Sequence, residues 1–192
     1  MGHLRTASSA AILLDHRRQS EMYSVDERDK VVELEHVPQS AAGSPSPIVF
    51  SDEYRVLLLY IVDTPLPNWD DAAVLTVDPP TGESLALVEF TGYSTYMFGA
   101  PNDEAFNGHP LAARGLSPYG AFQIENSSWI RQLERMNSVH PSHRPERFER
   151  LRHYVFSFHD STFECVANEF TVSTHEGSLE SMLPIMRARL ES

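Results

Sequence analysis

The longest apolar run in the chain covers residues 56–62, within the nearly continuously apolar stretch 54–62 (YRVLLLYIV). A stretch that is apolar at nearly every position is typical of a central strand whose two faces are both covered. Strand-like runs also occur at residues 72–78 and 84–91, on either side of the turn-forming sequence Pro79-Pro80-Thr81-Gly82. Because turn residues between two such runs favour a tight connection, this pattern predicts a β-hairpin.

Further strands are predicted in the second half of the chain. Residues 93–98 and 119–125 carry short strand-like runs, and residues 152–158 and 163–167 predict a second hairpin around Asp160-Ser161-Thr162. Residues 170–173 are expected to add one more short strand.

Residues 126–138 change to a helical period. Trp129, Leu133 and Met136 recur at i, i+4 and i+7, and the polar residues before them, Asn126 or Ser127, can cap the first turn. This spacing predicts an amphipathic helix that lies on the sheet.

Two more helices are expected. Pro145 is suited to the first turn of a short helix. The apolar spacing of residues 179–190 predicts a C-terminal helix after Gly177-Ser178. Pro184 lies inside that pattern, so we expect a kink or a late start there.

The element order is strands, helix, hairpin and helix, without the regular alternation of strand and helix that builds parallel sheets. We therefore predict an α+β fold, with a mainly antiparallel sheet and two amphipathic helices packed on it. Residues 1–46, with a Pro/Ser-rich linker at residues 38–47, are interpreted as a flexible N-terminal extension. Residues 47–192 are interpreted as one domain.

The composition limits the compartment and the partners. The chain has one cysteine, Cys165, so an internal disulfide is excluded and a reducing, cytoplasmic location is expected. The net charge is −12, and residues 51–110 hold ten acidic residues but only one basic residue, Arg55. This acidic middle segment would repel nucleic acid and anionic membranes. We therefore expect a small polar ligand or a basic protein partner, with no nucleic acid and no membrane.

One cluster of basic residues is an exception to this acidic composition. Arg144, Arg147, Arg150 and Arg152 are interleaved with Glu146 and Glu149. A solvated helix face explains such a pattern, and a clamp for a phosphate or carboxylate is the alternative.

The common catalytic signatures are absent from the sequence. There is no glycine-rich phosphate loop, GxGxxG, HExxH, GxSxG or CxxC. We expect no cofactor and no metal on this basis. His140 and His143, three residues apart, could bind a metal only with a third ligand from elsewhere, and a helix C-terminal cap is the simpler interpretation.

The long segment 99–120, between two predicted strands, is the first candidate site. It contains His109, which could act as a general acid or base, and three residues that could bind substrate: Asn102, Asp103 and Glu104. The alternative is that the Asn and Asp residues close turns and that His109 has a structural role.

The hairpin of residues 154–167 is the second candidate site. A two-residue turn at Ser161-Thr162 would place His159 opposite Glu164, with Asp160 beside them. Because a carboxylate raises the pKa of a neighbouring imidazole and fixes its tautomer, this pair could act as a general base. The opposite, aromatic face is the expected core and buries Cys165 there. A register slip of one residue would reverse both faces and expose this thiol.

Two functions follow from these patterns. The first is a small enzyme that uses His109, His159, Asp160 and Glu164 for acid–base chemistry on a small polar or cationic molecule. The second is a non-catalytic acidic interaction protein, such as an accessory subunit, an inhibitor or an antitoxin-like partner. A structural homo-oligomer, with residues 54–62 as an interface strand, is a weaker third hypothesis.

Overall fold

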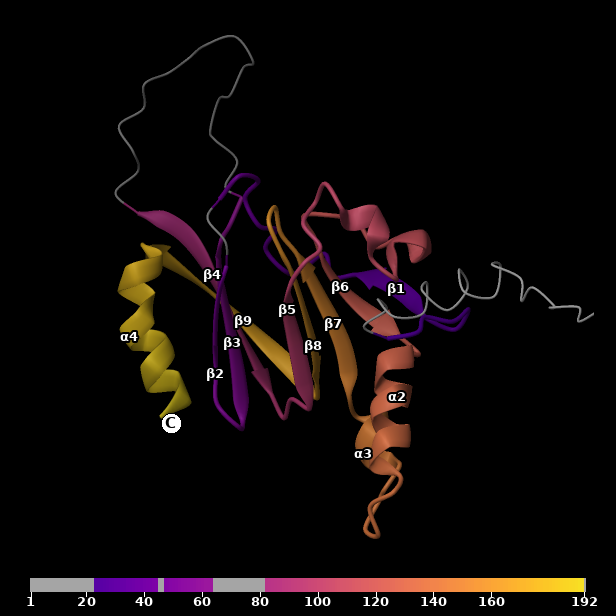
Figure 1. The fold of residues 1–192 in the computed structure, drawn as a ribbon. Coiled ribbons are helices and arrows are strands. Elements are labelled where there is room, and N and C mark those ends of the chain that lie inside the picture. Colours follow the sequence, from indigo (N-terminus) through magenta and orange to yellow (C-terminus); the bar gives the residue numbers. More distant parts are fainter. Residues whose placement is uncertain (1–22, 45–46, 64–81, 192) are drawn as a thin grey trace, which may run out of the picture.

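The computed structural model describes residues 23–44, 47–63 and 82–191, which form two antiparallel sheets packed face to face (Figure 1). The five-stranded sheet has the spatial order β1 (Lys30–Glu33), β6 (Ala121–Glu125), β7 (Arg152–Ser157), β8 (Thr162–Ala167) and β5 (Thr95–Gly99). The four-stranded sheet has the order β2 (Ile48–Ser51), β3 (Arg55–Ile61), β4 (Glu83–Thr91) and β9 (Glu169–Gly177). The predicted α+β class is confirmed.

Helices cover the outer faces of this sandwich (Figure 1). α4 (Leu179–Leu190) packs on the four-stranded sheet. The five-stranded sheet carries α2 (Ser128–Asn137), followed by the short α3 (Glu146–Glu149), together with two 3₁₀ turns, η1 (Phe106–Gly108) and η2 (Ala112–Arg114). No helix in residues 23–44, 47–63 and 82–191 is long and apolar enough to cross a membrane.

β3 is buried on both faces, as its continuous apolar run predicts. Leu58 faces the space between the sheets, whereas Leu57 and Leu59 face Met182 and Met186 of α4. Each fully buried leucine contributes about 1.5–3 kcal/mol to folding. Since β2 and β4 pair with its two edges, β3 is an internal strand and has no free edge for an interface.

Aromatic side chains fill the space between the two sheets. The ring of Phe90 on β4 lies 5.8 Å from Phe156 on β7 and 5.5 Å from Phe163 on β8, measured between centroids. The aromatic face of the 154–167 hairpin is therefore core, as predicted. Cys165 lies on the same face and is fully buried. Burial raises the pKa of its thiol, so Cys165 behaves as a small apolar residue and not as a nucleophile.

α2 confirms the helix predicted at residues 126–138. Ser127 is its N-cap and accepts a hydrogen bond from the backbone N–H of Ile130. Trp129 is buried against the five-stranded sheet and stacks on Tyr23 with a centroid distance of 5.5 Å.

The interpretation of residues 1–46 as an extension is wrong for residues 23–44. Lys30–Glu33 forms β1, which pairs with β6, and Tyr23 and Val37 are buried. Asp29 accepts a hydrogen bond of 2.6 Å from the backbone N–H of Ser128, at the start of α2. Polar residues flank these positions in the sequence, so no local apolar pattern explains why they are buried. The burial depends on partners in β6 and at the start of α2, roughly 90–100 residues away in the sequence.

The hairpin predicted from residues 72–78 and 84–91 is only partly recovered. β4 covers the second strand, but it pairs with β3 on one edge and with β9 on the other. Residues 72–78 lie outside the described residues.

The C-terminal helix begins at Leu179, so a late start at Pro184 is not observed. Ser178 and Ser181 form a capping box that stabilises the first turn before the proline is reached.

Candidate functional site

The hairpin of β7 and β8 does not have the predicted register. Ser157 pairs with Thr162, so the connection has four residues, 158–161, and Glu164 lies opposite Val155 instead of His159. Phe158 leaves the ladder because its ring is buried against Tyr60, 5.3 Å away. The register differs by four positions, an even number, so the two faces keep their predicted residues. His159 and Glu164 are therefore separated, and each belongs to a different cluster.

The loop of residues 99–120 docks on the tip of this hairpin. The backbone N–H of Asp103 donates to the carbonyl of His159 at 2.9 Å, and Thr162 Oγ1 donates to the carbonyl of Pro101 at 2.9 Å. The 99–120 loop and the 154–167 hairpin thus meet, as expected from the sequence. The contact brings Asp103 next to His159.

Three side chains converge at this tip. Asp103 Oδ2 lies 2.9 Å from His159 Nδ1 and accepts a hydrogen bond of 2.6 Å from Tyr119 Oη. Tyr119 Oη is also 2.8 Å from His159 Nδ1. With the Nδ1 proton directed at Asp103, neutral His159 has its Nε2 lone pair free to accept a proton. We call these three residues the tip cluster.

Local backbone contacts hold Tyr119 in this position. Tyr119 has a φ of 58°, and a Cβ on the next residue, Gly120, would lie 2.6 Å from the ring of Phe122. Ser157 Oγ accepts from the N–H of Gly120 at 3.0 Å and donates to the carbonyl of Ser117 at 2.8 Å. The end of β7 therefore anchors the turn that presents Tyr119.

The tip cluster shifts the acid–base properties of its members. Hydrogen bonding to Asp103, and then its charge, raise the pKa of His159, with smaller contributions from Asp160 and Glu104. The hydrogen bond from Tyr119 is the main cause that lowers the pKa of Asp103. The same bond raises the pKa of Tyr119. The side chain of His159 is 44% exposed, so its proton can exchange with solvent or with a ligand.

The second cluster is buried beneath α2 and the 99–120 loop. Glu164 Oε1 lies 3.2 Å from His109 Nε2, and Glu164 Oε2 lies 2.8 Å from His153 Nε2. Tyr23 Oη donates to Glu164 Oε2 at 2.7 Å. We call these four residues the buried cluster.

The hydrogen bonds of the buried cluster assign its protons. The backbone N–H of Leu111 donates to His109 Nδ1 at 3.1 Å, so the ring proton is on Nε2 and points at Glu164. His153 Nδ1 lies 2.9 Å from Ser127 Oγ, which also receives the N–H of Ile130 at 3.3 Å. A Ser127 hydroxyl that donates to Nδ1 leaves the His153 proton on Nε2. Both imidazoles can thus be neutral donors to one carboxylate.

This arrangement keeps Glu164 ionised inside the protein. Burial disfavours the charged form, but the hydrogen bonds from His109 and His153 outweigh it and lower the pKa of Glu164. Burial, and then the charge of Glu164, raise the pKa of Tyr23. The side chains of both histidines are 0% exposed and that of Glu164 is 2% exposed. The buried cluster joins four parts of the chain and is closed to solvent.

The structure thus divides the predicted catalytic residues between two places. His109 and Glu164 meet in the buried cluster, whereas His159 lies in the tip cluster with Asp160 Oδ1 3.9 Å from its Nε2. His159 and Asp160 border a hollow of about 10 Å³, which has room for about one water molecule. Within the described residues, these four side chains do not surround a common cavity. A substrate of His159 would therefore bind on the open surface.

The three predicted binding residues also differ in their surroundings. Asn102 Oδ1 accepts the backbone N–H of Ala105 at 3.1 Å and so closes a turn. Asp103 is in the tip cluster. Glu104 is exposed and contributes to the raised pKa of His159, so its charge acts near the imidazole.

The histidines at 140 and 143 lie just after the end of α2. His143 Nδ1 is 3.0 Å from Asn137 Oδ1, and His143 Nε2 is 3.5 Å from Glu134 Oε1. Within the described ranges, no group of three or more His, Cys, Asp or Glu side chains is arranged to hold a metal ion.

Three members of the tip and buried clusters were not among the site residues predicted from the sequence. His153 shares a strand face with Glu164 under simple alternation, so that signal was present in the sequence. Tyr119 was hidden in a strand-like run. Tyr23 belongs to a segment whose polar neighbours gave no sign of burial.

Comparisons with known proteins return no similar protein. No family model matches the chain, and no curated protein and no solved structure matches it.

Proposed function

We propose that the protein is an enzyme that uses His159 as a general base or acid on a small polar or cationic molecule. One observation carries the proposal: Asp103 Oδ2 contacts His159 Nδ1 at 2.9 Å, while the side chain is partly exposed and Nε2 has no hydrogen bond to any described residue. A carboxylate in this position orients the imidazole and stabilises its protonated form.

The charges around the tip support the choice of ligand. Asp103, Asp160 and Glu104 all act on His159 as negative charges. A cationic group beside His159 Nε2 would be attracted by these carboxylates, and Asp160 is more than half exposed and can contact a ligand directly. We place the protein in the cytoplasm, on the basis of its single cysteine.

The experiment is a screen of amines, guanidines and amino-acid esters and amides against the full chain. Binding is followed through the imidazole NMR signals of His159, and turnover of each compound is measured in parallel. We expect a ligand that shifts the His159 signals and whose turnover is lost in His159→Ala and reduced in Asp103→Asn.

A matched control is His140→Ala, because His140 is exposed and, among the described residues, its ring hydrogen-bonds only with the backbone N–H of Ser142. This variant should turn over the substrate at the wild-type rate. Equal rates in wild type and His159→Ala, or no compound that shifts the His159 signals, would contradict the proposal.

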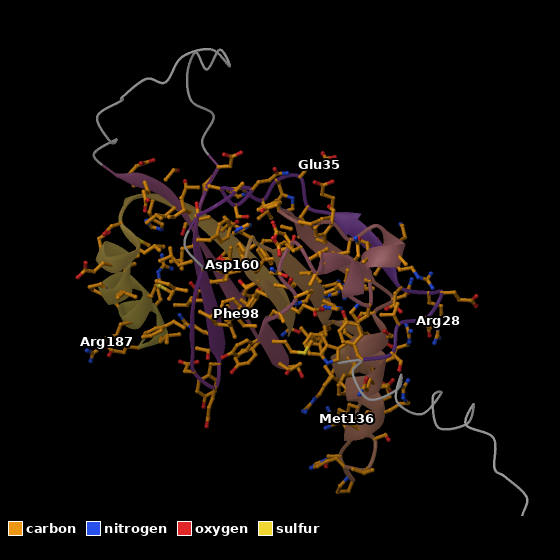
Figure 2. All side chains as sticks on the ribbon, turned by 45° about the horizontal axis from the view of Figure 1, so that its top comes forward. Arg28, Glu35, Phe98, Met136, Asp160 and Arg187 are labelled. Atoms are coloured by element: carbon orange, nitrogen blue, oxygen red, sulfur yellow. The ribbon has the colours of Figure 1, made fainter. Side chains whose placement is uncertain are left out.

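The alternative function, an acidic interaction protein, is supported by a different region. Two edge strands, β2 of one sheet and β5 of the other, contact each other through Ser51 Oγ and Tyr96 Oη, which are 2.9 Å apart. Phe50 and Phe98 on these strands are 39% and 43% exposed, and Phe98 is labelled in Figure 2. A salt-sensitive basic protein that co-purifies with the chain, and is lost with Phe50→Ser and Phe98→Ser, would favour this alternative.

A further inference from the structure

A groove beside α3 gathers most of the basic cluster seen in the sequence. It has a volume of about 820 Å³. α3 and its flanking residues form one wall, and the β4–β5 connection with Asn168 forms another. Its charged lining residues are Arg144, Glu146, Arg147 and Arg150, and its neutral polar lining includes Tyr93, Asn137 and Asn168. We call it the arginine groove.

The local backbone places the three arginines on one side of α3. The N–H of Arg147 donates to the carbonyl of Arg144, and neighbouring hydrogen bonds from Phe148 and Leu151 also reach back three residues. In such 3₁₀-like winding, side chains three positions apart lie above one another. Arg144, Arg147 and Arg150 are thus spaced about one turn apart in the sequence, and all three line the groove.

These guanidinium groups have no ion pair or side-chain hydrogen bond to any other described residue. Several arginines elsewhere in the fold have a carboxylate partner: Arg131 Nη2 lies 2.7 Å from Asp26 Oδ2, and Arg187 Nε lies 2.8 Å from Glu191 Oε1. In a chain of net charge −12, three adjacent arginines without a carboxylate partner are unexpected for a surface that serves only solubility.

The charge of the groove is local. Glu146 is the one carboxylate residue among the lining residues, so three arginines leave a balance of +2. A neighbouring groove of about 640 Å³ shares Phe148 and Leu151 with it but is balanced. That groove is lined by three arginines, Arg28, Arg131 and Arg152, and by three glutamates, Glu125, Glu134 and Glu149. Of these two grooves, only the arginine groove has an excess of positive charge.

A neutral residue with a hydrogen-bond donor, Asn168, also lines the groove. The side chain of Asn168 lies against Gly92, where a Cβ would be 2.2 Å from Asn168 Nδ2. Gly92 also has a φ of 58°, which favours glycine. The absence of a side chain at Gly92 therefore makes room for the Asn168 amide, and both residues line the groove.

We propose that the arginine groove binds the phosphate group of a small phosphomonoester. A phosphomonoester carries about −2 at neutral pH and three acceptor oxygens, which match a site of charge +2 with several forked donors. α3, which forms one wall of the groove, and the β7–β8 connection, which carries His159, lie at opposite ends of β7 (Figure 1). The six residues of β7 span about 20 Å. This site is therefore separate from the proposed proton-transfer site.

The test is titration of the full chain at low salt with four probes: inorganic phosphate, glycerol 3-phosphate, adenosine monophosphate and succinate. Binding is measured by calorimetry. We expect saturable binding of at least one phosphomonoester, tighter than that of inorganic phosphate and of succinate. Arg147→Gln should weaken it at least about tenfold, because a charge-assisted hydrogen bond is lost.

Arg135→Gln is the matched control, since Arg135 is an exposed arginine of α2 that does not line the groove. It should change the affinity less than about twofold, as expected for a distant surface charge. Asn168→Ala should weaken binding of the phosphomonoester a few-fold and leave the melting temperature unchanged. A purely non-specific attraction to positive charge would predict no loss of affinity, because this variant removes no charge.

Three results would overturn the proposal: no saturable binding of any phosphomonoester, equal loss of affinity in Arg147→Gln and Arg135→Gln, or succinate binding as tight as that of the esters. If inorganic phosphate binds as tightly as both esters, the claim of an ester ligand is overturned.

Discussion

The buried cluster and the tip cluster are built from the same chemical groups, a carboxylate, imidazole and a tyrosine hydroxyl, yet they differ in exposure. Glu164 is 2% exposed and every hydrogen-bonding atom of its histidines is engaged inside the protein. The side chain of His159 is 44% exposed, and one of its ring nitrogens makes no hydrogen bond to the part of the chain that the structure describes. The buried cluster therefore has the properties of a structural junction, and the tip cluster those of a site that exchanges protons.

The difference shows that a histidine–carboxylate pair alone does not identify a catalytic site. A general base needs one unoccupied nitrogen and access for a substrate. His109 has neither, because its Nδ1 accepts a backbone N–H and its ring is enclosed. In contrast, His159 has both.

The largest expected effect comes from removing the buried charge. Glu164→Gln replaces an acceptor of three hydrogen bonds with a group that presents donors to His109 or His153. We expect the free energy of unfolding to fall by about 3 kcal/mol, measured by urea denaturation. The control is Glu125→Gln, whose carboxylate makes an exposed ion pair with Lys30 and should cost less than about 1 kcal/mol. Similar losses in both variants would remove the distinction between the two environments.

The pH dependence of stability should reveal the same carboxylate. The pKa of Glu164 falls from its usual 4.5 to about 2 in the folded protein. Between these values the unfolded chain binds more protons, so the stability from Glu164 is complete above the higher pKa and is lost as pH falls through the lower one. The difference in unfolding free energy between wild type and Glu164→Gln should therefore shrink on acidification. A constant difference would contradict an ionised Glu164.

A smaller effect is expected at the tip. Asp103→Asn removes the main cause that raises the pKa of His159, so that pKa should fall towards its usual value of 6.5. In the wild type, the stability linked to His159 is present below pH 6.5 and is lost as pH rises through the raised pKa. NMR titration of the imidazole measures the change. Asp160→Asn should lower the same pKa less, because Asp160 is a weaker contributor; the reverse order would contradict the tip geometry.

The smallest effect is expected for Tyr119→Phe. It removes the hydroxyl that donates to Asp103 Oδ2 at 2.6 Å, so the pKa of Asp103 should rise. Carbon-13 NMR of the Asp103 carboxyl can follow this change. Tyr93→Phe is a suitable control, since the Tyr93 hydroxyl donates to the carbonyl of Asp52 instead. An unchanged pKa of Asp103 in Tyr119→Phe would show that this hydroxyl does not stabilise the carboxylate.

The sequence by itself determined the local elements and the faces of the strands. The apolar run at residues 54–62 predicted a doubly covered strand, and the helical period after Ser127 predicted α2, because burial periodicity is a short-range signal. Alternation along residues 154–167 assigned Cys165 and Phe163 to the core. The predicted faces are correct although the predicted register is wrong, because the two registers differ by an even number of residues.

Tertiary structure alone decided which groups meet. The four-residue connection depends on the packing of Phe158 against Tyr60, a contact between residues almost 100 positions apart. Tyr23 reaches Glu164 across 141 residues, and no local pattern encodes that distance. Pairings of this kind come from the packing of two sheets and their helices. The solvent exposure of each side chain, which separates a structural carboxylate from a reactive one, was therefore known only once the fold was known.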